Sequence, residues 1–224
     1  MNLCKMLKKK DVGATGIGAM IVFIATVLVA GIAASVMIQT SMRLESQAMS
    51  TGQKTVEEVA SGLAVTDVAG YCVLSSGKIS RMTITVRPRA GSPDVDLNQT
   101  FIELSNGSAK IILGYSGTLA DSWYDSATGV NNIFSLAAFP AVANRYGIVP
   151  MEDADSSCNL TTPIINIGDK VMLCIDTSKT FSESAGILVR TDILGAVIPE
   201  DGSPAVIGFT TPNSYGAETI FDLQ

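Results

Sequence analysis

The sequence contains no histidine. Histidine is the commonest general acid or base in enzymes and a frequent zinc ligand, so its absence argues against a catalytic site and a zinc centre. The chain also has no Gly-rich loop followed by Lys and Ser or Thr, which is the pattern that cradles phosphates. We find no pairing of a nucleophile with a general base. We therefore expect a protein that is not an enzyme and that requires no cofactor.

Charged residues are few, at 16% of the chain, and they are unevenly placed. The first 13 residues hold four lysines and one aspartate and so carry a net charge of +3. Because the whole chain has a net charge of −6, the remainder carries −9. An acidic body without a basic patch and interleaved aromatic residues does not suit nucleic-acid binding. It suits a solvated outer surface, and we expect no nucleic-acid partner.

Cysteines are also few, and three of the four lie beyond the N-terminal head, at Cys72, Cys158 and Cys174. An odd number in a domain that is expected to be exported leaves at least one thiol unpaired. A disulfide between Cys158 and Cys174 would contribute roughly 3 kcal/mol. Alternatively, Cys174 is a buried apolar residue within the run at residues 171–175. The sequence leaves both alternatives open.

The chain does have a run of 31 residues without a charge, Val12 to Met42, directly after the basic head. A helix needs about 20 apolar residues to cross the hydrocarbon core of a bilayer, and a helix satisfies its own backbone hydrogen bonds there. By the positive-inside rule, the four lysines before the run hold the N-terminus in the cytoplasm. We therefore expect a precursor in the cytoplasmic membrane, with the rest of the chain outside.

The helix is expected to continue beyond the membrane and to span residues 14–65. Met42, Met49, Val56 and Leu63 recur every seven residues, which favours packing against other helices. Small residues are frequent in its first half, and they let neighbouring backbones approach closely. The residues expected to mediate polymerisation are Ile17, Met20, Ile21, Phe23, Ile24, Val27, Leu28, Ile32, Met42, Met49, Val56 and Leu63.

After Gly62 the sequence changes to short β-rich runs separated by Gly, Pro, Asn and Ser. Met82, Ile84 and Val86 alternate with polar residues, as in a half-buried strand. Strands are expected at residues 71–74, 79–86, 100–104, 109–113, 170–175, 186–189 and 205–210, whereas residues 115–165 carry no clear signal. The predicted fold class is α+β, with a long N-terminal hydrophobic α-helix followed by an all-β sandwich in an outer domain at residues 66–224.

Residues 13–38 read GATGIGAMIVFIATVLVAGIAASVMI. This stretch, with the run onward to Leu63, closely resembles the N-terminus of archaeal flagellins, or archaellins. The outer part resembles the family more loosely, through residues 87–97 (RPRAGSPDVDL) and 209–212 (FTTP). The resemblance implies an immunoglobulin-like outer domain and a chain that polymerises through its N-terminal helix. The resulting filament would be the extracellular shaft of the archaellum, which a motor at its base turns for swimming.

The resemblance also implies a class III signal peptide at residues 1–13. A membrane protease related to prepilin peptidase would cut after the glycine that follows the basic stretch, here between Gly13 and Ala14. Asp11 and Val12 depart from the family, which often has basic residues directly before this glycine. The other expected partners are copies of this chain or other archaellins, and the archaellum platform and motor. The membrane is expected to be a partner only before assembly.

Three alternatives remain at this stage. Type IV pilins share the processing, and most carry glutamate at the fifth mature position. Counted from Ala14, that position here is Gly18, which favours an archaellin over a pilin-like adhesion filament. The second alternative is a secreted β-domain binding protein cut near residues 33–35, for which the apolar run is rather long. The third is an anchored surface enzyme, against which the absence of histidine argues.

Two kinds of site are predicted in the outer domain. N-glycosylation sequons begin at Asn98, Asn106 and Asn159. Archaellins are commonly N-glycosylated, so the resemblance strengthens the prediction that at least one is used.

The second kind is a cation site in an acidic loop, where Asp153 and Asp155 are spaced like the first ligands of a calcium loop. Cys158 stands where such a loop needs glycine, and Ile164 stands where it needs glutamate, so the loop is not an EF-hand. The resemblance allows a Ca²⁺ or Mg²⁺ site in the outer domain. The favoured interpretation of this loop is a solvated charged turn.

Overall fold

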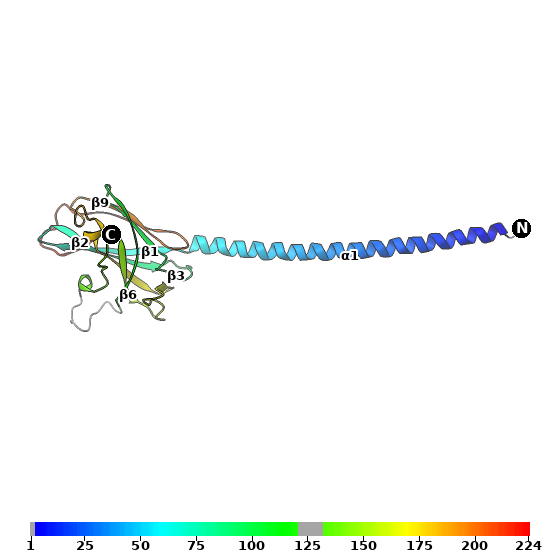
Figure 1. Cartoon of the computed structure of the whole chain (residues 1–224), viewed down its shortest axis with the longest axis horizontal. Helices are drawn as coiled ribbons and strands as arrows, with labels where there is room; N and C mark the ends of the chain where they lie inside the picture. The colour runs from blue at the N-terminus through cyan, green and yellow to red at the C-terminus, as the bar shows by residue number, and fades with distance from the viewer. Residues whose placement is uncertain (1–2, 121–131) are drawn as a thin grey trace. The chain divides into compact units, whose positions relative to one another are not determined.

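The computed structural model describes the backbone of residues 3–120 and 132–224. The chain divides into two compact units, Met1–Lys54 and Thr55–Gln224. The first unit is helical, and the second holds all the strands of the described residues. The predicted class, a long hydrophobic helix followed by a mostly β domain, is confirmed (Figure 1).

The helix α1 spans Leu3–Ala60 without interruption (Figure 1). No proline occurs before Pro88, so every residue of α1 can donate its backbone N–H. The hydroxyls of Thr26 and Thr40 donate to the carbonyl oxygens of Phe23 and Met37, at 2.8 and 2.9 Å. These bonds satisfy the two hydroxyls within the helix and leave its surface apolar there.

The prediction that the helix includes Leu63 is wrong, because α1 ends at Ala60. Gly62 takes a backbone φ of +141°, which L-residues with side chains rarely adopt. A Cβ at this position would lie 2.5 Å from the carbonyl oxygen of Ser203, with which Gly62 forms a parallel bridge. Leu63 is therefore the first residue of a strand and is fully buried. Leu63 matches the seven-residue repeat, but Gly62 ends the helix before Leu63 is reached.

The β domain is built on one nine-stranded sheet with the order β10-β9-β4-β5-β6-β8-β2-β1-β11 and a two-stranded sheet of β3 and β7. All of the strand pairs are antiparallel except β5 with β6. The strands are β1 (Leu63–Val73), β2 (Lys78–Pro88), β3 (Val95–Asp96), β4 (Phe101–Ser105), β5 (Lys110–Leu119), β6 (Arg145–Glu152), β7 (Ile164–Ile165), β8 (Lys170–Ile175), β9 (Asp192–Ile198), β10 (Ala205–Thr210) and β11 (Ile220–Asp222).

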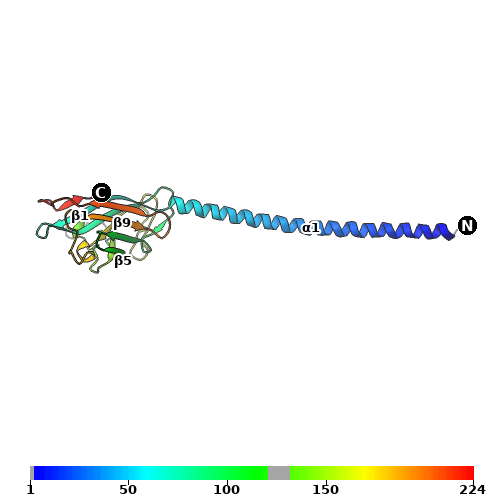
Figure 2. The ribbon, with the colours of Figure 1, turned by 90° about the horizontal axis from the view of Figure 1, so that it is seen from above.

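Strand β5 joins the two halves of the large sheet. Its first part, Lys110 to Leu113, pairs with β4, and its second part, from Gly114 onward, pairs with β6. One hydrophobic core receives side chains from both halves, including Ile102 of β4 and Leu173 of β8. The halves therefore face each other across this core as a β-sandwich, in which β1, β5 and β9 can be followed in Figure 2.

Tyr146 on β6 is the largest fully buried side chain of this core. Its hydroxyl lies 2.7 Å from the carbonyl oxygen of Leu97 and 2.9 Å from that of Thr100. The single proton is shared between these two acceptors, so the loop before β4 is tied to the centre of the sandwich. Burial raises the pKa of Tyr146 far above its usual range, and the residue stays neutral.

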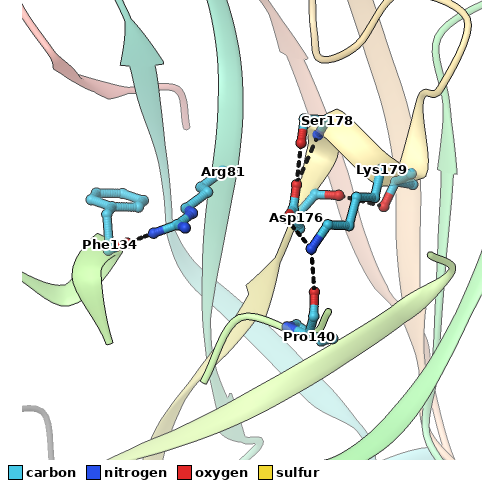
Figure 3. Close-up of polar contacts among 7 residues, drawn as sticks. Arg81, Phe134, Pro140, Asp176, Ser178 and Lys179 are labelled. Carbon is cyan, nitrogen blue, oxygen red and sulfur yellow. Dashed lines mark hydrogen bonds and ion pairs between the residues drawn. The ribbon is translucent and has the colours of Figure 1, made fainter. Parts of the chain in front are cut away.

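A smaller apolar cluster covers part of the other face of the sheet, with Ala138, Val149, Met172 and Cys174 buried in it. It lies under the segment 132–140, which contains a short 3-10 helix, Ile133–Ser135. Two cationic side chains hold this segment, as Figure 3 shows. Arg81 donates to the carbonyl oxygen of Phe134, and Lys179, of the short helix α2 (Thr177–Thr180), donates to that of Pro140 at 3.2 Å.

Asp176 supports the Lys179 contact in two ways. Its carboxylate lies 3.0 Å from the Lys179 ammonium, and it also accepts a hydrogen bond from the hydroxyl of Ser178 (Figure 3). The Arg81 guanidinium also lies 5.0 Å from the centre of the Phe139 ring, within cation–π range. These contacts hold an irregular segment in place, in a region where no strand or helix was predicted.

The sequence left two alternatives for Cys174, a disulfide with Cys158 or a buried apolar role, and in the structure both cysteines are free and buried. On β8, Leu173 and Ile175 point into the main core, whereas Met172 and Cys174 point into the smaller cluster. Cys158 belongs to the main core, so the sheet separates the two sulfur atoms. Burial raises the pKa of each thiol to about 12, which makes both of them unreactive.

Candidate polymerisation helix and outer-domain sites

The apolar side chains of α1 are exposed along the described part of the helix. Eleven of the residues predicted to mediate polymerisation lie on α1, and each has between 54% and 71% of its surface exposed. They are Ile17, Met20, Ile21, Phe23, Ile24, Val27, Leu28, Ile32, Met42, Met49 and Val56. Full burial of one such side chain contributes about 1.5–3 kcal/mol, so leaving all of them in water is unfavourable. The helix needs lipid or other protein around it.

The glycines of α1 also indicate that this helix packs against other helices. A Cβ placed on Gly16, Gly18, Gly31 or Gly52 would meet no described atom within 4 Å outside the neighbouring helical backbone. Each glycine lowers helix stability by about 1 kcal/mol relative to alanine, and no contact within the described chain requires it. The absence of a side chain instead permits close approach by a neighbouring helix.

One structural feature agrees with the expectation that α1 anchors the precursor in a membrane. A single described helix, Thr15–Ala60 within α1, is long and apolar enough to cross a bilayer, and none of its most apolar window is buried. A secretory signal or a membrane anchor would pass the same test. The expected precursor in the membrane therefore stays a prediction.

Gly13 and Ala14, the predicted cleavage junction, lie within the helical range of α1, and Gly13 is exposed. A Cβ on Gly13 would meet no described atom within 4 Å. The cleavage itself stays a prediction.

The three sequons lie in loops of the β domain. Asn98 and Asn159 are exposed, and Asn106 is half-buried in the turn between β4 and β5. The side-chain oxygen of Asn106 accepts hydrogen bonds from the backbone N–H groups of Ser108 and Ala109, at 3.1 and 2.8 Å. These two bonds fix the Asn106 amide in one orientation at the tip of the hairpin.

The acidic loop brings together the two predicted aspartates, Asp153 and Asp155, and a third, Asp169, that was not predicted. One carboxylate oxygen from each of Asp153, Asp155 and Asp169 lies within 4.8 Å of the others. Asp169 comes from the turn before β8 and is buried. Its only sequence signal was an acid in a Gly-Asp turn directly before an apolar strand.

Hydrogen bonds organise the three carboxylates. The backbone N–H of Ser157 lies 3.2 Å from Asp153 and 3.1 Å from Asp155, and the side-chain amide of Asn166 donates to Asp155 at 2.6 Å. The bonds from Ser157 and then Asn166 hold the pKa of Asp155 below its usual range, so it stays ionised. Oxygen donors of this type are those that Ca²⁺ and Mg²⁺ prefer, and their convergence fits one such cation.

An exposed apolar helix followed by a β-sandwich fits a structural protein that assembles through its helix. Comparison with known proteins agrees. The family model of archaeal-type flagellin matches residues 13–209. The chain is 43% identical to flagellin B2 of Methanocaldococcus jannaschii over the full length of both, and 38% identical to flagellin B1 of Methanococcus voltae over the full length of both.

Solved structures show the same likeness. The crystal structure of archaeal flagellin FlaB1 from Methanocaldococcus jannaschii matches with a TM-score of 0.63 and 32% identity, over 74% of this chain and 98% of that one. The archaeal flagellum of Methanospirillum hungatei matches in fold, with a TM-score of 0.60 and 15% identity, over 92% of this chain and 99% of that one. The chain belongs to the archaeal-type flagellins. It is a structural subunit of the extracellular archaellum filament and is not an enzyme.

Proposed function

We propose that the chain is made as a precursor anchored in the cytoplasmic membrane by α1 and is then cut between Gly13 and Ala14. The protease is of the prepilin-peptidase type and lies in the same membrane. The mature chain joins copies of itself or other flagellins on the archaellum platform, and the motor turns the resulting filament for swimming. The exposed apolar surface of α1 is the observation that supports this sequence of events.

The physical argument is that α1 exchanges one apolar environment for another. Leucine, isoleucine, valine and phenylalanine side chains are as well solvated by lipid tails as by other helices, so the transfer from membrane to filament core has a small free-energy cost. The lysines of the head do not share this property, because burial of an unpaired ammonium group costs several kcal/mol. Removal of residues 1–13 therefore prepares the helix for burial among its copies.

N-terminal sequencing of chains from native filaments tests this proposal. We expect the sequence to begin at Ala14. A start near Ser35 would instead support a secretory signal and a released β domain, and an intact Met1 would support a permanent anchor. Either result would contradict the proposed route, because each predicts a different fate for α1.

The cation site stays a prediction, and the three carboxylates of Asp153, Asp155 and Asp169 define its test. If the three carboxylates hold a cation, millimolar Ca²⁺ should raise the melting temperature of the purified chain and a chelator should reverse the effect. Saturation at a hundred times the dissociation constant stabilises a protein by about 2.7 kcal/mol. Asp155→Asn should abolish the calcium effect, whereas Asp94→Asn, at an exposed acid outside the cluster, should preserve it. An equal calcium response in both variants would show that the loop is a solvated turn.

A further inference from the structure

A surface cavity of about 250 Å³ lies beside the sequon at Asn106. Asn106 and Ser108 of the β4–β5 turn line one side, and the segment 181–191 lines the other. A second hollow of about 110 Å³ adjoins it and is also lined by Asn106 and by Glu183. Pockets for drug-sized ligands begin at roughly 300 Å³, so the larger hollow has room for one sugar ring and little more.

The floor of this cavity is rigid. Ile187 and Ile79 exchange two backbone hydrogen bonds, each of 3.0 Å, and the Lys78 ammonium donates to the carbonyl oxygen of Ser184 at 2.6 Å. Gly186 has a φ of +126°, and a Cβ there would lie 2.5 Å from the carbonyl oxygen of Ile79. The segment is thus fixed against β2 without any ligand, and the cavity is preformed.

The lining of the cavity suits a carbohydrate. Glu183 is exposed and forms no ion pair among the described residues, so its carboxylate is available to accept hydrogen bonds from sugar hydroxyls. Leu188 is 45% exposed and offers an apolar surface to the C–H face of a sugar ring. A polar acceptor and an apolar surface in one lining suit a pyranose ring, which has hydroxyl groups and an apolar C–H face.

We propose that the first sugar of an oligosaccharide linked to Asn106 is seated in this cavity, against Glu183 and Leu188. The proposal rests on the prediction that a sequon of this chain is glycosylated, and it selects Asn106 for a structural role. The seated sugar connects the β4–β5 turn to the segment 181–191. Glycosylation at this site therefore slows opening of that end of the sandwich.

Amide hydrogen exchange on the mature chain purified from native filaments tests the seating. Ser108→Ala removes the sequon but keeps Asn106 and its two hydrogen bonds, because both donors are backbone N–H groups. We expect this variant to exchange about tenfold faster at Ile187 and its neighbours. Ser108→Thr, which keeps the sequon, and Thr161→Ala, which removes the sequon at Asn159, should exchange like the unaltered chain.

A second variant separates the seating of the sugar from its attachment. The double substitution Glu183→Ala with Leu188→Ala should leave Asn106 occupied in glycopeptide mass spectra, yet give the same tenfold faster exchange. If Asn106 is occupied in the unaltered chain but the Ser108→Ala variant exchanges at the unaltered rate, the seating is overturned and glycosylation stays intact. Occupancy only at Asn98 or Asn159 would overturn the choice of Asn106, and three unoccupied sequons would overturn the glycosylation prediction itself.

Discussion

A Gly13→Phe chain is expected to accumulate as uncut precursor in the membrane and to yield no filaments. The proposed protease must hold the peptide bond between Gly13 and Ala14 in an extended form, but both residues lie in the helical range of α1. Glycine weakens a helix by about 1 kcal/mol relative to alanine, so it eases local unwinding. Phenylalanine makes local unwinding of the helix harder and places a bulky ring beside the peptide bond to be cut.

The effect on assembly should be nearly complete. An uncut chain keeps four lysines directly before the apolar run, and burial of these ammonium groups among apolar helices costs several kcal/mol each. Immunoblots of membrane and filament fractions measure the result, because the precursor keeps the mass of the 13-residue head. Gly52→Ala, a helical glycine far from the junction, should be processed normally. Normal filaments from the Gly13→Phe chain would contradict the cleavage proposal.

The helix could be predicted from sequence because its signals are local. A run of 31 uncharged residues and a seven-residue stripe report on consecutive residues of one element. The end of α1 could not be predicted from the seven-residue repeat of Met42, Met49 and Val56, because Leu63 continues that repeat although it belongs to β1. Only the contact of Gly62 with Ser203, distant in sequence, explains why the helix stops where it does.

The β domain was predictable in class and less so in detail. Predicted runs overlap β1, β2, β4, β5, β8 and β10, whereas the run at 186–189 forms only an isolated bridge between Ile187 and Ile79. The strands β6 and β9 and the short strands β3, β7 and β11 were missed. In β9, Leu194 and Ile198 are exposed apolar residues that break the expected alternation. In β6, Tyr146, Ile148 and Val149 are all buried, because an apolar cluster lies on each face of the sheet.

Sites built from distant residues were predicted only in part. Asp153 and Asp155 could be named because they lie two residues apart, but Asp169 joins them only through the fold. The choice between a disulfide and two free cysteines could not be made from the sequence for a related reason. Sequence spacing allows a bridge between Cys158 and Cys174, but strand alternation places their sulfur atoms on opposite sides of a sheet.

Gly31→Leu should have opposite effects on the isolated chain and on the filament. In the isolated chain a Cβ at Gly31 meets no described atom within 4 Å outside the neighbouring helical backbone. Leucine also forms helix better than glycine, by roughly 0.7 kcal/mol. Circular dichroism of detergent-solubilised chains should therefore show equal or higher helicity and an unchanged melting transition of the β domain.

In the filament the same side chain must fit between helices that approach closely at a small residue. Overpacking at such a contact costs about 1–3 kcal/mol, and every added subunit carries the substitution. Because 1.4 kcal/mol is a tenfold change in an equilibrium constant, the concentration of chain needed for assembly should rise by about 5–150-fold. Filament yield by sedimentation and electron microscopy measures this, with Gly31→Ala as an intermediate case. Filaments at normal yield from the Gly31→Leu chain would mean that this part of α1 faces no neighbouring helix, and the glycines would then need another explanation.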